Sequence, residues 1–320
     1  MYCRIWTRKF GTDTDKVPLV LLHGMGAGLA MFVLNFSALA ADRTVYAIDL
    51  PGFGRSSRVH FSSSPGEIEA EYVDCLDAWR MKVGLERINL VGHSFGGHLT
   101  GLYALKYPQH LHTATLADPW GMTERPSDPT NTSNSHSGSP PRRVPGWVRV
   151  VARVLVHFNP LWGLRAAGPA GPWLVGRTRP DIVRKYEGLL GEERTGLVSD
   201  YIFHCNGHTP TGESAFHRLM SGFGWANSPL LPRLGKLEKN GETSNNCQTR
   251  EAILSFTVKL NVMYGSNSWM THLQEEDFRT AGVEGEVEVT YIEGAGHHIY
   301  SDQPDHFNNS LSKLLQSHDS

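Results

Sequence analysis

Short apolar runs alternate with longer helical patterns along the chain, except in its middle third. The apolar runs predict six strands, at residues 17–22, 44–50, 87–91, 113–117, 258–264 and 287–292. Helical patterns at residues 67–83 and 97–107 lie between some of these runs. Because strands that alternate with helices form parallel sheets with crossover connections, we expect an α/β fold with a mostly parallel sheet.

The middle of the chain, residues 120–257, departs from this rhythm. It is proline-rich, irregular and weakly helical, and it is too long for an ordinary connection inside a compact domain. We interpret it as a cap inserted between two parts of one core, residues 1–119 and 258–320. Within the cap, residues 127–145 are polar and of low complexity, which predicts disorder, and residues 236–250 resemble a second mobile loop.

Composition and charge exclude several functions. A formal net charge of -2 gives no basic field for nucleic acid, and the four cysteines lie at no metal-ligand spacing, which argues against a zinc site. We expect neither a metal nor an organic cofactor. The first residues contain no secretory signal and no stretch reaches the length of a membrane span. We expect a cytoplasmic protein, with peripheral membrane contact left open.

The sequence GHSFG at residues 92–96 lies directly after a predicted strand and before a predicted helix. This strand-turn-helix context identifies a nucleophile elbow, with Ser94 as the nucleophile. The flanking glycines fit the sharp turn, because a side chain at either position would collide with the strand or the helix.

A second glycine-containing turn, HGMGAG at residues 23–28, follows the first predicted strand. In a hydrolase this loop supplies one oxyanion-hole amide, and we assign that amide to Met25. The second donor would be the Phe95 amide at the start of the nucleophile helix. Without Ser94, the same segment would read as a plain glycine turn.

The candidate base lies near the C-terminus, in GAGHH at residues 294–298. Its order after Ser94 agrees with the hydrolase order of nucleophile, acid and histidine. Only one of the two adjacent histidines can face Ser94, and we choose His297.

The candidate acid is ambiguous. The loop after the strand at residues 258–264 contains no carboxylate in residues 265–271, where many hydrolases place the acid. Glu275 follows shortly after, and Asp118 ends the strand that follows the nucleophile helix. Each residue also has a non-catalytic interpretation. Glu275 fits the solvated start of a helix, and Asp118 fits a turn residue before Pro119. Without an acid the histidine can adopt the wrong tautomer, so reduced hydrolysis is an alternative.

The chain resembles the abhydrolase-domain family four and five, which comprises lysophospholipase-like enzymes and lipid-droplet lipase coactivators. The matching segments are DLPGFGRS (49–56), GHSFGG (92–97), LKYP (105–108), DPWG (118–121), YG (264–265), Trp269 and GHHIYSDQP (296–304). The resemblance implies an α/β-hydrolase core of the eight-stranded type. Ser94 stands where the coactivator branch has asparagine, which favours the lipase branch, whereas Thr271 occupies the family's acid position.

The resemblance also implies a lysophosphatidic acid acyltransferase activity, because His297 and Asp302 form the H-x4-D spacing of glycerolipid acyltransferases. The residues themselves favour a different interpretation. In it His297 is the hydrolase base, and Asp302 caps the closing helix by accepting first-turn amides.

The cap contains a segment suited to lipid. Residues 144–179 combine tryptophans and phenylalanine with five arginines and no acidic residue. These are Trp147, Phe158, Trp162, Trp173, Arg149, Arg153, Arg165, Arg177 and Arg179. Such a segment fits an anionic lipid interface, and equally a cap that buries its apolar side chains against the core. Both interpretations place apolar surface over Ser94 and favour an acyl-chain substrate.

We therefore expect a serine lipid hydrolase or acyltransferase that acts on acyl glycerophospholipids in lipid homeostasis, of lysophospholipase, N-acyl-phosphatidylethanolamine lipase or lysophosphatidic acid acyltransferase type. The main alternative is a non-catalytic lipid-droplet protein that regulates a separate lipase, motivated by the absent acid. An esterase for small soluble substrates is the third, and a polar pocket under the cap would favour it.

Overall fold

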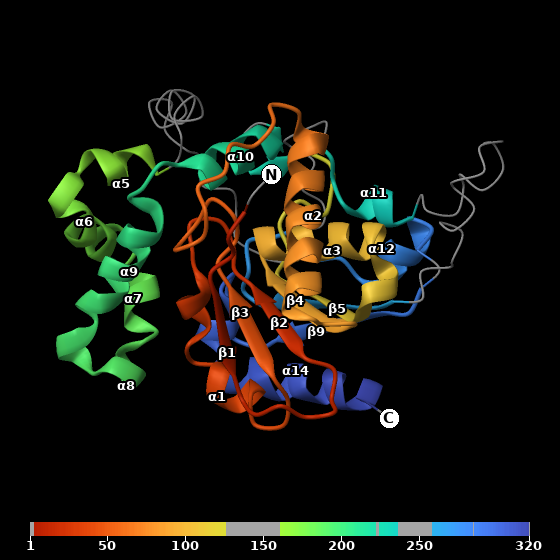
Figure 1. The fold of residues 1–320 in the computed structure, drawn as a ribbon. Coiled ribbons are helices and arrows are strands. Elements are labelled where there is room, and N and C mark those ends of the chain that lie inside the picture. The colour runs from red at the N-terminus through yellow and green to blue at the C-terminus, as the bar shows by residue number, and fades with distance from the viewer. Residues whose placement is uncertain (1–2, 126–160, 222–223, 236–257, 284, 320) are drawn as a thin grey trace, which may run out of the picture.

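The computed structural model describes residues 3–125, 161–221, 224–235, 258–283 and 285–319, and its centre is a seven-stranded sheet (Figure 1). The strands are β1 (Thr7–Phe10), β2 (Leu19–Leu22), β3 (Val45–Ile48), β4 (Ile88–His93), β5 (Leu111–Ala117), β8 (Lys259–Gly265) and β9 (Val287–Ile292). Their order is β1-β3-β2-β4-β5-β8-β9. Only β1 is antiparallel to its neighbour, so the prediction of a mostly parallel sheet is confirmed.

The six predicted strands are all present in the main sheet, which has seven strands in the described residues rather than eight. The strand of this sheet that the sequence does not predict is β1, which contains Arg8 and Lys9, both exposed. Edge strands often carry charged side chains such as lysine, which oppose pairing with another chain. Because of its polar composition, the apolar pattern does not predict β1. This strand pairs with β3 from Thr7↔Ile48 to Phe10↔Val45.

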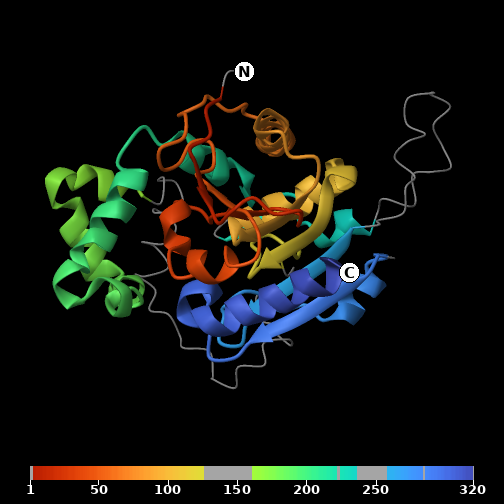
Figure 2. The same ribbon diagram turned by 60° about the horizontal axis from the view of Figure 1, so that its bottom comes forward.

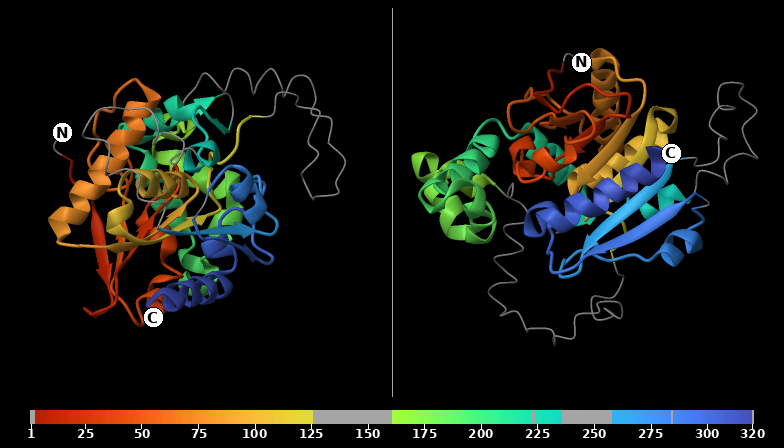
Figure 3. Two further views of the ribbon diagram at one scale, coloured as in Figure 1. Left: turned by 90° about the vertical axis from the view of Figure 1, so that its right-hand side faces the viewer. Right: turned by 90° about the horizontal axis from the view of Figure 1, so that it is seen from below.

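The sheet is covered on both faces (Figure 3). Val20 and Leu22 of β2 belong to the apolar cluster that contains α2 (Pro65–Val83) and α3 (Phe95–Lys106). Leu19 and Leu21 belong to the opposite cluster, with α1 (Phe36–Leu39) and α14 (Pro304–Asp319). Successive side chains of a strand point to opposite faces, so a strand buried on both faces must be apolar throughout, as β2 is.

The insert lies between β5 and β8 in the chain, and its described residues are mostly helical, with one short pair of strands. Its elements are α5 (Trp162–Ala166), η3 (Gly168–Ala170), α6 (Gly171–Thr178), α7 (Pro180–Arg184), α8 (Glu187–Leu190), η4 (Glu192–Arg194), α9 (Gly196–Asn206), α10 (Thr211–Leu219), the strands β6 (Met220–Ser221) and β7 (Trp225–Ala226), and α11 (Leu231–Leu234). The green helices α5 to α9 stand to one side of the sheet (Figures 1 and 2). Phe216 of α10 and Leu230 before α11 join the core cluster.

Shorter elements complete the fold: η1 (Leu29–Phe32), η2 (Pro108–His110), α12 (Glu275–Thr280) and α13 (Ile299–Asp302). The predicted disorder at residues 127–145 and the predicted loop at residues 236–250 lie outside the described residues. In the ranges that the structure describes, no helix combines the length and the apolar character that a membrane crossing requires.

Candidate active site

Ser94 lies at a sharp turn between β4 and α3. Its φ of 54° and ψ of −113° are unusual for a residue with a side chain, and such backbone strain costs about 1–3 kcal/mol. The surrounding packing imposes it. A Cβ on Gly92 would lie 2.0 Å from the Gly96 carbonyl oxygen, and a Cβ on Gly96 would lie 2.6 Å from the Leu22 carbonyl oxygen. The two flanking glycines therefore allow α3 to begin directly against the strands.

His297 lies on the loop after β9 and faces this turn. The Ser94 hydroxyl lies 3.1 Å from His297 Nε2, in position to donate a hydrogen bond to it. Of the two adjacent histidines, His297 is therefore the one beside the candidate nucleophile. This contact joins residues that are 203 positions apart in the sequence.

Asp118, at the end of β5, lies on the other side of the His297 ring. Its Oδ2 is 2.5 Å from His297 Nδ1, and its side chain is fully buried. The same carboxylate accepts hydrogen bonds from the Ser268 hydroxyl at 2.6 Å and from the Gly265 amide at 3.2 Å. Ser94, His297 and Asp118 thus form a continuous hydrogen-bonded chain.

The loop after β8, which contains no carboxylate, has a different part in the site. Ser268 in that loop donates to the acid that β5 supplies, and sequence reasoning missed this role. The feature that could have indicated this role is the strand order. Since β5 and β8 are parallel neighbours, their carboxyl ends meet. Glu275 is directed elsewhere, accepting from the Val289 amide at 3.4 Å and pairing with Arg279. The structure brings Asp118, and not Glu275, to His297.

Asp302 does not cap the closing helix, so that prediction was wrong. It is the last residue of α13, and this turn directs its carboxylate back toward the histidine loop, where it accepts from the Gly296 amide at 2.9 Å. Its other oxygen pairs with Lys185 at 2.6 Å. Asp302 supports the backbone beside His297, whereas the His297 ring bonds to Asp118.

The candidate oxyanion amides lie beside the nucleophile. A Cβ on Gly24 would lie 3.1 Å from Ser94 Cβ, so the loop before Met25 touches the elbow. Among the described residues, the Met25 and Phe95 amides have no hydrogen-bond acceptor. Two backbone donors near a nucleophile can stabilise the negative charge that develops on a substrate carbonyl oxygen.

His23 holds the start of this loop. Its Nδ1 lies 2.7 Å from the Gly24 carbonyl oxygen, and its Nε2 accepts from the Leu50 amide at 2.9 Å. This pattern requires a neutral imidazole that donates with one nitrogen and accepts with the other. Burial lowers the pKa of His23, which favours that neutral form.

Two further histidines pack around His297. His93 Nε2 lies 2.8 Å from the His297 carbonyl oxygen, and its ring lies against the His297 ring at 4.8 Å. Burial lowers the pKa of His93 well below its usual value, and burial together with the nearby Lys185 charge lowers the pKa of His298 to about 2. Both imidazoles are therefore neutral near pH 7; both pack in this cluster, and His93 also donates to the His297 carbonyl oxygen.

An apolar cavity of about 330 Å³ adjoins the triad. Its lining includes Met122, Trp225, Trp269 and Met270, and the Trp269 ring lies 5.0 Å from the His297 ring. None of the described residues that line it carries a charge. Through Trp269 the cavity lies close to His297, and its lining suits an apolar group rather than a charged headgroup.

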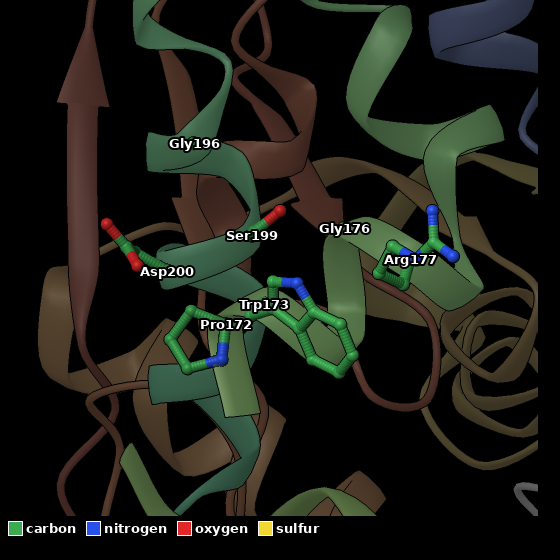
Figure 4. A pocket seen from close by; sticks show the side chains of 7 residues that line it. All are labelled: Pro172, Trp173, Gly176, Arg177, Gly196, Ser199 and Asp200. Carbon is green, nitrogen blue, oxygen red and sulfur yellow. The ribbon is translucent and has the colours of Figure 1, made fainter. Parts of the chain in front are cut away.

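A second cavity, of about 290 Å³, lies on the insert between α6 and α9 (Figure 4). Trp173, which is 67% exposed, and Arg177 line it, and Trp162 of α5 is 57% exposed. These residues belong to the segment for which the sequence predicts lipid contact; Trp147, Arg149, Arg153 and Phe158 lie outside the described residues. Peripheral membrane binding through the cap stays a prediction. Within the described ranges, no three His, Cys, Asp or Glu side chains gather as potential metal ligands.

Comparisons with known proteins give the same fold and name lipid-directed activities. A family model described as alpha/beta hydrolase fold matches residues 17–304. The chain is 38% identical over 317 residues to the 1-acylglycerol-3-phosphate O-acyltransferase ABHD5 of Homo sapiens, covering 99% of this chain and 82% of that protein. It is also 38% identical over 317 residues to the (lyso)-N-acylphosphatidylethanolamine lipase of Mus musculus, covering 99% and 84%. Among solved structures, the enol-lactonase from Burkholderia xenovorans LB400 aligns with a TM-score of 0.62 at 17% identity, covering 98% of this chain and 96% of that one.

Proposed function

This chain belongs to the alpha/beta hydrolase family, in the group that contains ABHD5 and the (lyso)-N-acylphosphatidylethanolamine lipases, and from this premise we propose that it is a serine hydrolase or acyltransferase for acyl glycerophospholipids. The observation that carries the proposal is the continuous hydrogen-bonded chain of Ser94, His297 and Asp118. This arrangement activates a serine for acyl transfer.

The reaction proceeds in two steps. Ser94 Oγ attacks the acyl carbonyl while its proton passes to His297 Nε2, and the Met25 and Phe95 amides bind the resulting oxyanion. His297 returns the proton to the leaving alcohol or amine, which leaves an acyl-enzyme. Water or the hydroxyl of a lysophospholipid then attacks the acyl group, with His297 as general base, and the acceptor determines whether the outcome is hydrolysis or acyl transfer.

Two features support a lipid substrate over a small polar ester. Both relatives are named for lipid-directed activities, one as an acyltransferase and one as a lipase. In addition, two methionine and two tryptophan side chains help to line the cavity near His297, and none of its described lining residues carries a charge. An acyl chain can bury its methylenes there at about 25 cal/mol per Å² of apolar surface removed from water.

The alternative of a non-catalytic lipid-droplet regulator was motivated by the absent carboxylate after β8. The contact between Asp118 and His297 Nδ1 at 2.5 Å supports Asp118 as the acid and counts against that alternative. The reactivity of Ser94 is the property that distinguishes the regulator from the enzyme.

The proposal is tested by labelling the folded protein with a fluorophosphonate probe. Wild type is expected to label at one site, and Ser94→Ala is expected not to label, because only an activated serine reacts at a useful rate. Product analysis with lyso-N-acylphosphatidylethanolamine, and with lysophosphatidic acid plus an acyl donor, then identifies the acceptor. A folded wild type that does not label would overturn the proposal and favour the regulator.

Filling the cavity tests its assignment to the acyl chain. Met270→Trp is expected to lower kcat/KM for long-chain esters about tenfold relative to butyrate esters, because a bulkier side chain excludes methylenes from the pocket. The measurement is the ratio of kcat/KM values across a series of chain lengths. The same substitution on the exposed surface of α2, Met81→Trp, serves as the control and should leave the ratio unchanged. An unchanged ratio in Met270→Trp would place the acyl chain elsewhere.

A further inference from the structure

The oxyanion-hole loop contacts helix α9 of the insert through specific hydrogen bonds. The Asn206 side-chain amide, at the end of α9, donates to the Gly26 carbonyl oxygen at 2.6 Å, and Asn206 is only 6% exposed. Five residues earlier in α9, Tyr201 Oη accepts from the Ala30 amide at 2.9 Å. These contacts bridge about 170–180 positions of sequence, from the insert to the loop after β2.

The oxyanion-hole loop and α9 are packed in direct contact. A Cβ added to Gly28 would lie 2.3 Å from Tyr201 Oη and 2.8 Å from Cys205 Sγ. The backbone of the loop therefore packs directly against side chains of α9. A displacement of α9 must displace the loop or break these bonds.

Met25 lies between two anchors. On one side, His23 holds the Gly24 carbonyl, and on the other, Asn206 holds the Gly26 carbonyl. Within the loop itself, the Ala27 amide bonds to the Gly24 carbonyl at a long 3.3 Å, and Gly26 has a φ of 72°. Because the internal bonding is weak and glycine is conformationally permissive, the direction of the Met25 amide depends on the external anchors.

We propose that Asn206 is a positioning residue for the oxyanion hole, and that α9 is a fixed part of the active site rather than a lid that lifts from it. The inference rests on the proposed function, since it assigns a role within that reaction. Asn206 acts on the reaction only through the Gly26 carbonyl. The donor it orients is the Met25 amide, which binds the charge that develops in the transition state.

The location of the apolar cavity agrees with a fixed α9. The cavity is bounded by the segments at residues 119–123, 224–225 and 269–271, and no described residue of α9 lines it. A substrate can therefore enter beside Trp269 without breaking the bonds between α9 and the oxyanion loop.

The test compares Asn206→Leu with wild type on a short-chain ester and with a trifluoromethyl ketone inhibitor. Both need the oxyanion hole, because Ser94 Oγ adds to the carbonyl carbon of the ester or the ketone and the carbonyl oxygen becomes an oxyanion. We expect kcat to fall roughly 10- to 100-fold with KM changed by less than about threefold, and the affinity for the ketone to fall in parallel with kcat.

Asn89→Leu is the matched control. Asn89 is also a buried asparagine whose amide donates to a backbone carbonyl, that of Val17 at 3.0 Å, but it lies at the start of β4, the end of the strand remote from Ser94. This variant is expected to lower the melting temperature while kcat of the folded protein stays within about twofold of wild type. A loss of stability alone therefore does not reproduce the expected kinetic signature.

The outcomes are distinguishable. If Asn206→Leu does not fold, the near-isosteric Asn206→Asp is used, since a carboxylate cannot donate to the Gly26 carbonyl. A folded variant with wild-type kcat and ketone affinity would overturn the positioning role while the proposed function stands. A wild type that neither cleaves the ester nor binds the ketone would overturn the proposed function and this role with it.

Discussion

Replacing Asp118 with asparagine is expected to lower kcat by about 10⁴ with little change in fold. The asparagine side chain is almost the same size, so the buried site can accept it. Its amide group, however, can donate to His297 Nδ1, and that contact stabilises the tautomer in which Nε2 carries the proton. A protonated Nε2 cannot accept the proton of Ser94. The measurement is kcat on a short-chain ester, with circular dichroism to verify folding.

Asp302→Asn is the control, because it removes the other carboxylate of the H-x4-D pair. Asp302 bonds to the Gly296 amide and to Lys185 rather than to the His297 ring. Asparagine keeps an oxygen acceptor for the amide, so we expect kcat to change by less than about tenfold. The reverse pattern, with Asp302→Asn inactive and Asp118→Asn active, would contradict the assignment of Asp118 and favour the acyltransferase-type pair.

The nucleophile and the base could be predicted because their signals are local. Ser94 lies in a five-residue motif between a strand and a helix, and His297 lies in a glycine-rich turn after the last strand. Asp118 could not be distinguished from Glu275, because the choice depends on which strands are neighbours. Once β5 is placed beside β8, Ser268 and Asp118 lie at adjacent strand ends, and the hydrogen bond between them follows.

Sequence patterns could not predict the residues that hold the loops of the site in place. The contact of Asn206 with Gly26 joins segments 180 positions apart, and an asparagine at the end of a helix carries no signal of its own. The interpretation of Asp302 as a helix cap failed for a related reason. The spacing before Pro304 suits a cap, but the single turn of α13 directs the carboxylate toward Gly296 instead.

The largest effect is expected for His297→Ala, which should lower kcat by about 10⁶ while leaving the protein folded. His297 is the group that receives the Ser94 proton and returns it to the leaving group, so both steps lose their proton carrier. The reaction that remains depends on the oxyanion amides and on binding alone. The measurement is kcat on an activated ester, with added imidazole to test whether an external base restores part of the activity.

His298→Ala tests whether this loss belongs to one histidine or to the pair. Burial lowers the pKa of His298 to about 2, and its ring lies 5.4 Å from the ring of His93. We expect His298→Ala to destabilise the protein, because it leaves a cavity in this packed cluster, but to keep kcat within about tenfold of wild type. Equal losses in the two variants, with imidazole rescuing both, would contradict a single base and require that the neighbouring histidine also exchange protons with the substrate.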